Sequence, residues 1–199
     1  MKFEFLQLAF KTAVEAADMS KYDGSHVGAV LVKDSRIVAT GWNGYPSGVN
    51  DKYVNTLPRD KRLMMTIHAE NNAILNAAKA GVQIEGCDAI VTHKPCVQCL
   101  SKMRNAGVAT VRYIVNEGFE AAWCDQHEDL YNMIEGIELH RFKKENVLPT
   151  EHHRNLYSTL DSYQVAKPVV LIEDIVYAGP PVEPKFMTDF IAKRFGEVE

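Results

Sequence analysis

The sequence has few cysteines, no long hydrophobic run and no strongly basic stretch, and each absence excludes a class of protein. Its four cysteines are too few for a disulfide scaffold in a chain of 199 residues, so we expect reduced thiols. No apolar run approaches the roughly 18 residues that a membrane span needs. The amino-terminal MKFEFLQLAFK is too mixed in polarity for a signal peptide. These features predict a cytoplasmic protein outside the membrane.

The charge balance argues against a nucleic-acid polymer as partner. The formal net charge is −4, and Lys and Arg form only short clusters such as residues 59–62. Proteins that bind DNA or RNA usually present a basic face to the phosphates, so we expect a small-molecule substrate. With 46% hydrophobic residues, the chain can bury a core, which excludes a largely disordered protein.

Hydrophobic periodicity predicts alternating helices and strands up to residue 142. The predicted helices span residues 2–18, 66–80, 95–106 and 119–134. The predicted strands span residues 27–32, 36–41, 89–92, 108–115 and 137–142. This alternation is typical of an α/β fold in which helices cover a sheet.

Other stretches carry weaker signals. Turn-forming residues dominate residues 42–65 and periodicity is lost there, which predicts a long loop that is either functional or poorly ordered. Weak signals for two helices and one strand follow later, at residues 149–164, 184–195 and 169–172. We therefore expect one domain over residues 1–145 and an extension of unknown role over residues 146–199.

One His, one Glu and two Cys residues form the pattern with chemical meaning. His68 and Glu70 fall at the start of one predicted helix, and Cys96 and Cys99 at the start of another. A helix start lowers the pKa of a thiol toward the thiolate that binds metal. One His and two Cys ligands leave a corner of a tetrahedral zinc site open for water, whose pKa zinc lowers to about 7. A nearby carboxylate can then carry the protons that hydrolytic deamination requires.

The Cys pair alone permits other interpretations. Cys96-x-x-Cys99 also fits a redox-active pair or half of a closed structural zinc site. His68 and Glu70 are two residues apart and would not share a face of a regular helix, so their convergence depends on the geometry of the helix start. A non-catalytic zinc module has no use for Glu70, so we favour an enzyme.

Five motifs carry a family resemblance: SHVGAV at residues 25–30, GWNGYPSG at 41–48, HAENNAI at 68–74, PCVQC at 95–99 and AGV at 106–108. Over residues 25–115 the chain resembles the cytidine and deoxycytidylate deaminase superfamily. The Asn-Gly-x-Pro-x-Gly loop points to the dCMP deaminase branch. The resemblance implies a three-layer α/β/α fold with a central five-stranded mixed sheet.

The resemblance also implies an activity and its residues. The expected reaction is zinc-dependent hydrolysis of dCMP to dUMP and ammonia, which supplies dUMP for thymidine nucleotide synthesis. One Zn²⁺ per chain would be bound by His68, Cys96 and Cys99, with Glu70 as the proton carrier. Further candidates for substrate binding are Asn43, Ala69, Ser25 and His93. Regulated members bind dCTP or dTTP, here with Mg²⁺, and the matching effector residues are Gly44, Tyr45, Pro46, Ser47 and Gly48. The implied assembly is a homo-oligomer, with a hexamer favoured.

Several alternatives stay open. The substrate could be another cytosine nucleotide or nucleoside, such as dCTP, a 5-substituted dCMP or cytidine. Trp42 and Tyr45 could either stack on a base or pack in the protein. We expect Cys87 and Cys124 to be buried free thiols and the His152–His153 pair to lie on the surface. The cations that could bind a phosphate are Arg59, Lys61, Arg62, Arg104 and Arg112.

Overall fold

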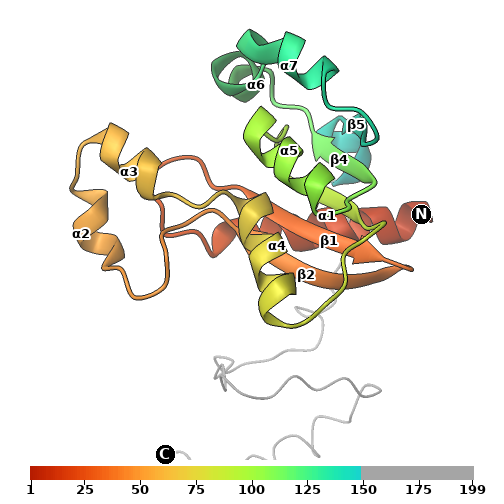
Figure 1. Cartoon of the computed structure of the whole chain (residues 1–199), viewed down its shortest axis with the longest axis horizontal. Helices are drawn as coiled ribbons and strands as arrows, with labels where there is room; N and C mark the ends of the chain where they lie inside the picture. Colours follow the sequence, from red (N-terminus) through yellow and green to blue (C-terminus); the bar gives the residue numbers. More distant parts are fainter. Residues whose placement is uncertain (149–199) are drawn as a thin grey trace, which may run out of the picture. The chain divides into compact units, whose positions relative to one another are not determined.

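The computed structural model describes residues 1–148, and these residues form a five-stranded mixed sheet (Figure 1). The helices and strand predicted beyond residue 148, and the His152–His153 pair, lie outside the described residues. The strands are β1 (Gly28–Lys33), β2 (Arg36–Trp42), β3 (Asp88–Val91), β4 (Thr110–Ile114) and β5 (Glu138–Phe142). Their order in the sheet is β2-β1-β3-β4-β5. β1 is antiparallel to β2 and β3, whereas β3, β4 and β5 are parallel. The predicted mixed sheet is therefore confirmed.

Helices cover both faces of the sheet, which confirms the three-layer fold. On one face, α1 (Phe3–Asp18) packs through Phe10 against Val30, Val32 and Ile90 of the sheet. On the other face, α4 (Ala69–Lys79) and α5 (Val97–Asn105) pack against the alternate residues of the same strands. Figure 1 shows α4 and α5 in front of the sheet and α1 behind it. The period-two alternation along β1 therefore divides the core into two layers.

The closest approach between α4 and the sheet depends on a glycine. A Cβ atom at Gly41 of β2 would collide with the backbone of Ala69 and Ala73 on α4. Because glycine lacks that atom, the first turn of α4 can lie directly on the strand. Ala69 and Ala73 are themselves fully buried. This contact fixes the helix start that carries His68 and Glu70.

The prediction of a loop over residues 42–65 holds for residues 43–50 and is wrong from residue 51 on, because two short helices lie there: α2 (Asp51–Asn55) and α3 (Arg59–Met65). The side chain of Asn50 accepts a hydrogen bond from the backbone of Tyr53 and caps α2, and Pro58 stands directly before α3. Of the residues interpreted as turn formers, Asn50, Asp51 and Pro58 are thus helix-start residues. Helices of five and seven residues are too short to give a periodic signal.

The single helix predicted over residues 119–134 is also wrong. The chain forms α6 (Glu117–Trp123), a 3₁₀ turn η1 (Asp125–His127) and α7 (Glu128–Asn132). Cys124 interrupts the helix because its backbone angles, φ −122° and ψ −48°, leave the helical region. A short helix α8 (Lys144–Val147) follows β5. Within residues 1–148, no helix has the length and hydropathy needed to cross a bilayer.

Candidate active site

The structure brings the predicted metal ligands together. The Nδ1 atom of His68 lies 3.6 Å from the Sγ atom of Cys96 and 3.3 Å from that of Cys99. All three donor atoms lie within 4.8 Å of one another, and residues 1–148 contain no other such group. In a tetrahedral zinc site, bond lengths of about 2.3 Å to sulfur and 2.05 Å to nitrogen place these atoms about 3.6 Å apart. The three side chains therefore fit three corners of a zinc site.

Two helix starts produce this geometry. His68 precedes α4 and Cys96 precedes α5, and both residues have extended backbone angles. Cys99 lies in the first turn of α5 and Glu70 in the first turn of α4. Because His68 stands outside the helix, the rule that residues two apart face different ways does not apply to it and Glu70. Both side chains line the same pocket.

Hydrogen bonding within the cluster favours one thiolate. Hydrogen bonds from Cys99 and then His68 lower the pKa of Cys96 to about 4. The pKa of Cys99 is raised, first because its thiol donates to Cys96 and then because it is buried. The hydrogen bond to Cys96 raises the pKa of His68. The lowered pKa of Cys96 favours its thiolate, the form that binds metal.

Glu70 is a buried acid beside this cluster. Its side chain is 4% exposed, and burial raises its pKa, although nearby His68 opposes that shift. A carboxyl group with a raised pKa is suited to accepting a proton and releasing it again near neutral pH.

A pocket of about 330 Å³ opens beside the cluster. Of the predicted substrate residues, Ser25, Asn43, Ala69 and His93 all line it. Asn43 is 6% exposed, and its side chain accepts from the backbone of Val27 at 2.8 Å and donates to that of Ser25 at 2.9 Å. Asn43 therefore supports the pocket wall through both ends of its amide.

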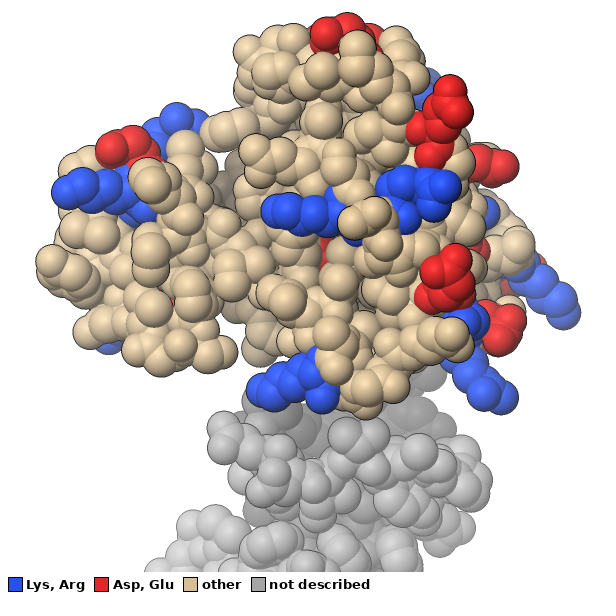
Figure 2. Space-filling view, in the orientation of Figure 1, with Lys and Arg blue, Asp and Glu red and all other residues tan. Residues whose placement is uncertain are grey.

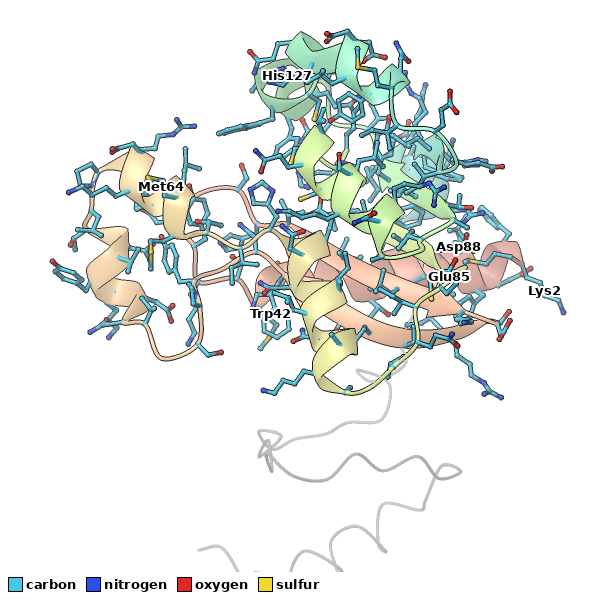
Figure 3. The ribbon with its side chains drawn as sticks, in the orientation of Figure 1. Lys2, Trp42, Met64, Glu85, Asp88 and His127 are labelled. Atoms are coloured by element: carbon cyan, nitrogen blue, oxygen red, sulfur yellow. The ribbon has the colours of Figure 1, made fainter. Side chains whose placement is uncertain are left out.

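The predicted effector residues Gly44, Tyr45, Pro46, Ser47 and Gly48 do not line this pocket. Gly44 pairs with Ile67 through two backbone hydrogen bonds of 2.8 and 3.0 Å, directly before His68. The hydroxyl of Tyr45 donates to Asn55 at 2.7 Å. Trp42 lies beside α4 (Figure 3), where its carbonyl accepts from Asn72 at 2.7 Å. Trp42 and Tyr45 therefore have packing roles.

Two of the five candidate cations line the pocket, namely Arg59 and Arg62 of α3. Figure 2 shows positively charged side chains over α3, beside the hollow that separates it from α4 and α5. Arg62 donates to the carbonyl and carboxylate of Asp23 at 2.9 and 3.3 Å, and its buried Nε has no partner within residues 1–148. Arg112 instead pairs with Asp88, Arg104 donates to the carbonyl of Glu135, and Lys61 is exposed outside the pocket.

The sequence did not single out several pocket residues, namely Tyr22, Asp23, Leu63, Thr66, Lys94, Phe119 and Trp123. Phe119 and Trp123 come from α6, far along the chain from the motifs, so no local pattern links them to the site. Burial lowers the pKa of His93, which favours a neutral ring facing Phe119. Cys87 and Cys124 are fully buried free thiols, as predicted.

Comparison with known proteins places this site in context. The model of the cytidine and deoxycytidylate deaminase zinc-binding region matches residues 3–115. An uncharacterized deaminase in the luxG 3' region of Aliivibrio fischeri is 43% identical over 134 residues, which cover 65% of this chain and 88% of that protein. Human deoxycytidylate deaminase is 30% identical over 146 residues, which cover 69% of this chain and 77% of that protein.

The chain is also similar to a solved structure. The dCMP deaminase of cyanophage S-TIM5 superimposes with a TM-score of 0.57 at 32% identity. The match covers 71% of this chain and 100% of the phage chain. The phage protein has also been solved in complex with dCMP and dUMP.

Proposed function

This chain belongs to the cytidine and deoxycytidylate deaminase family, and from that premise we propose that it hydrolyses dCMP to dUMP and ammonia. In this proposal one Zn²⁺ would be bound by His68, Cys96 and Cys99, and Glu70 would carry protons. One observation carries the proposal: three donor atoms spaced for zinc lie beside a buried carboxylate, at a pocket that also contains two guanidinium groups.

The chemistry divides between the metal and Glu70. When bound by three protein ligands, zinc keeps an open position and acidifies water there. Glu70 accepts a proton from water and delivers it to the ring nitrogen next to the amine. A second proton passes to the amine, which leaves as ammonia, so one water is consumed for each dCMP. Burial raises the pKa of Glu70, which supports this role because the free-energy difference between its protonated and ionised forms near neutral pH becomes smaller.

The two arginines that line the pocket support a nucleotide rather than a nucleoside as substrate. Arg62 is already oriented by Asp23 and lies over the ring of Tyr22, 5.9 Å from its centroid. Its Nε is buried and has no hydrogen-bond partner within residues 1–148. A guanidinium group held in this way binds the oxygens of a phosphate monoester, and Arg59 adds a second charge. Cytidine has no phosphate to bind either cation.

Regulation, assembly and domain organisation remain predictions. We propose that dCTP activates and dTTP inhibits, with Mg²⁺, through residues 44–48, and that the chain forms a homo-oligomer, with a hexamer favoured. Residues 1–145 form the deaminase domain in this proposal, and residues 146–199 are an extension. The supply of dUMP for thymidine nucleotides and the cytoplasmic location are part of the same proposal.

An ammonia-release assay tests the substrate. Purified protein is compared on dCMP, CMP, cytidine, dCTP and 5-methyl-dCMP, each with and without dCTP or dTTP. We expect the highest kcat/KM for dCMP and loss of turnover after zinc is chelated, with recovery when zinc is returned. Equal or faster turnover of cytidine would contradict the role of the two arginines, and full activity without metal would contradict the zinc centre.

A further inference from the structure

The loop that carries Cys96 joins β3 to α5 and spans residues 92–96. Its first residue is held by the sheet, because the backbone N–H of Thr92 donates to the carbonyl of Gly28 at 3.0 Å. The N–H of Gly28 returns a bond of 3.1 Å to the Thr92 hydroxyl. The ring of His93 shares a hydrogen bond of 3.0 Å with the Thr92 hydroxyl. Other partners of residues 93–95 lie outside the loop.

Those partners lie on residues 119–131, which we call the support segment. The ring of His93 packs on Phe119 with 4.6 Å between centroids. The ammonium group of Lys94 lies 3.8 Å from Asp125 and 3.5 Å from Glu128. The same ammonium group lies over a ring of the support segment, 4.7 Å from the centroid of Tyr131. A lysine side chain that is only 10% exposed is thus held between two carboxylates and an aromatic face.

The shortest of these contacts reaches the residue before the metal ligand. The hydroxyl of Tyr131 donates to the carbonyl of Pro95 at 2.6 Å. Pro95 is fully buried and Tyr131 is 9% exposed, so the bond is shielded from water. Burial also raises the pKa of Tyr131, which keeps its proton in place for donation. The Cys124 thiol approaches the carbonyls of Lys94 and Pro95 only at 3.7 and 4.0 Å.

This bond acts on the orientation of Cys96. The Pro95 carbonyl belongs to the peptide plane that ends at the Cα atom of Cys96, so fixing its oxygen restricts that plane. Cys96 precedes α5, and its Sγ atom is hydrogen-bonded to Cys99 and His68. The backbone from which this Sγ atom projects belongs to the loop, and the loop is held by the support segment.

We propose that Tyr131 is a positioning residue of the metal centre, which holds the Pro95–Cys96 peptide so that Cys96 meets His68 and Cys99 in ligand geometry. The inference rests on the zinc centre of the proposed function. It goes beyond the matched family region, which ends at residue 115, because the hydroxyl donor lies outside that region. Groups that orient metal ligands typically change metal affinity 10- to 100-fold when removed.

The test is Tyr131→Phe in the full chain, which removes one hydroxyl and keeps the ring beneath Lys94. We expect zinc release to a chromogenic chelator to be about 10-fold faster, measured without nucleotide. The visible absorption bands of the Co²⁺-substituted protein should shift, and kcat should fall while KM changes little. Tyr113→Phe is the matched control, since Tyr113 is 5% exposed and its hydroxyl makes no hydrogen bond within residues 1–148.

Zinc release from Tyr131→Phe at the wild-type rate, with an unchanged Co²⁺ spectrum, would overturn the proposal. If that variant fails to fold, Lys94→Met provides a second test at the same loop. It should also release zinc faster, and an unchanged rate would overturn the role of the support segment. These measurements need no substrate, so they test this inference separately from the proposed function. If the protein does not deaminate dCMP but Tyr131→Phe still releases zinc faster, the proposed function is contradicted and this inference is supported.

Discussion

The guanidinium group of Arg59 lies over the ring of Trp123, 5.2 Å from its centroid. Arg59 belongs to α3 and Trp123 to α6, so this contact joins two segments that line the pocket from different parts of the chain. Any nucleotide that enters meets a charged group and an aromatic face already in contact. We therefore expect the pair to contribute to substrate binding rather than to the chemical step.

Replacing Trp123 with alanine should raise the KM for dCMP and leave kcat nearly unchanged. A cation–π contact at an exposed site contributes about 0.5–1 kcal/mol, which corresponds to roughly a 2- to 5-fold change. Steady-state kinetics on dCMP measures the effect. Leu130→Ala is a matched control, because both side chains are 38% exposed and Leu130 does not line the pocket. A large fall in kcat for Trp123→Ala would contradict this assignment.

The Glu70→Gln variant should lose turnover and keep its metal. General acid–base catalysis contributes about 10²-fold or more, and the amide cannot carry protons. Glu70 is not among the three zinc-spaced donors, so zinc content should remain at one per chain. Ammonia release and metal analysis on the same sample separate the two effects, with the exposed Glu85→Gln as control. Near-normal turnover in Glu70→Gln would remove Glu70 from the mechanism.

Cys99→Ser should release zinc and lower the melting temperature. Metal binding contributes to the stability of the folded state, and the variant loses one of three protein ligands. Cys87→Ala is the control, because Cys87 is equally buried but lies outside the cluster. It should lose stability through packing alone and retain zinc. Equal zinc contents in the two variants would exclude Cys99 as a ligand.

Arg62→Met should reduce selectivity for the phosphate. A hydrogen bond to a charged group contributes about 1.5–3 kcal/mol, so kcat/KM for dCMP should fall roughly 10- to 100-fold. Turnover of cytidine, which has no phosphate, should fall much less. The ratio of the two kcat/KM values is the readout, and Lys61→Met, outside the pocket, is the control. A parallel loss on both substrates would mean that Arg62 acts through the fold.

Gly41→Ala should destabilise the domain by about 1–3 kcal/mol, the usual cost of overpacking. The added methyl group meets the backbone of α4, which cannot move away without displacing His68 and Glu70. Urea unfolding measures the free energy, and zinc content should fall in parallel. Gly118→Ala is the control, because its nearest neighbour would be Asn116 at 3.7 Å. It should be neutral or stabilising, since helical glycine is unfavourable.

The sequence predicted the residues whose spacing is local and missed those that meet only through the fold. The strands of the sheet and the helix starts at His68 and Cys96 follow from periodicity and from local motifs. Helices α2 and α3 were missed because they are shorter than the window in which periodicity can be recognised. The contacts of Lys94 and Tyr131 depend on how separate segments pack, which no spacing along the chain encodes.

The backbone pairing of Gly44 with Ile67 holds the two ends of residues 45–66 together, so that these residues form an insert closed at its base. Loops that are closed at the base tolerate changes in length and sequence at small thermodynamic cost. Arg59 and Arg62 lie on this insert and the zinc-spaced donors do not, so we expect that changes in the insert alter which nucleotide is bound without moving the zinc-spaced donors.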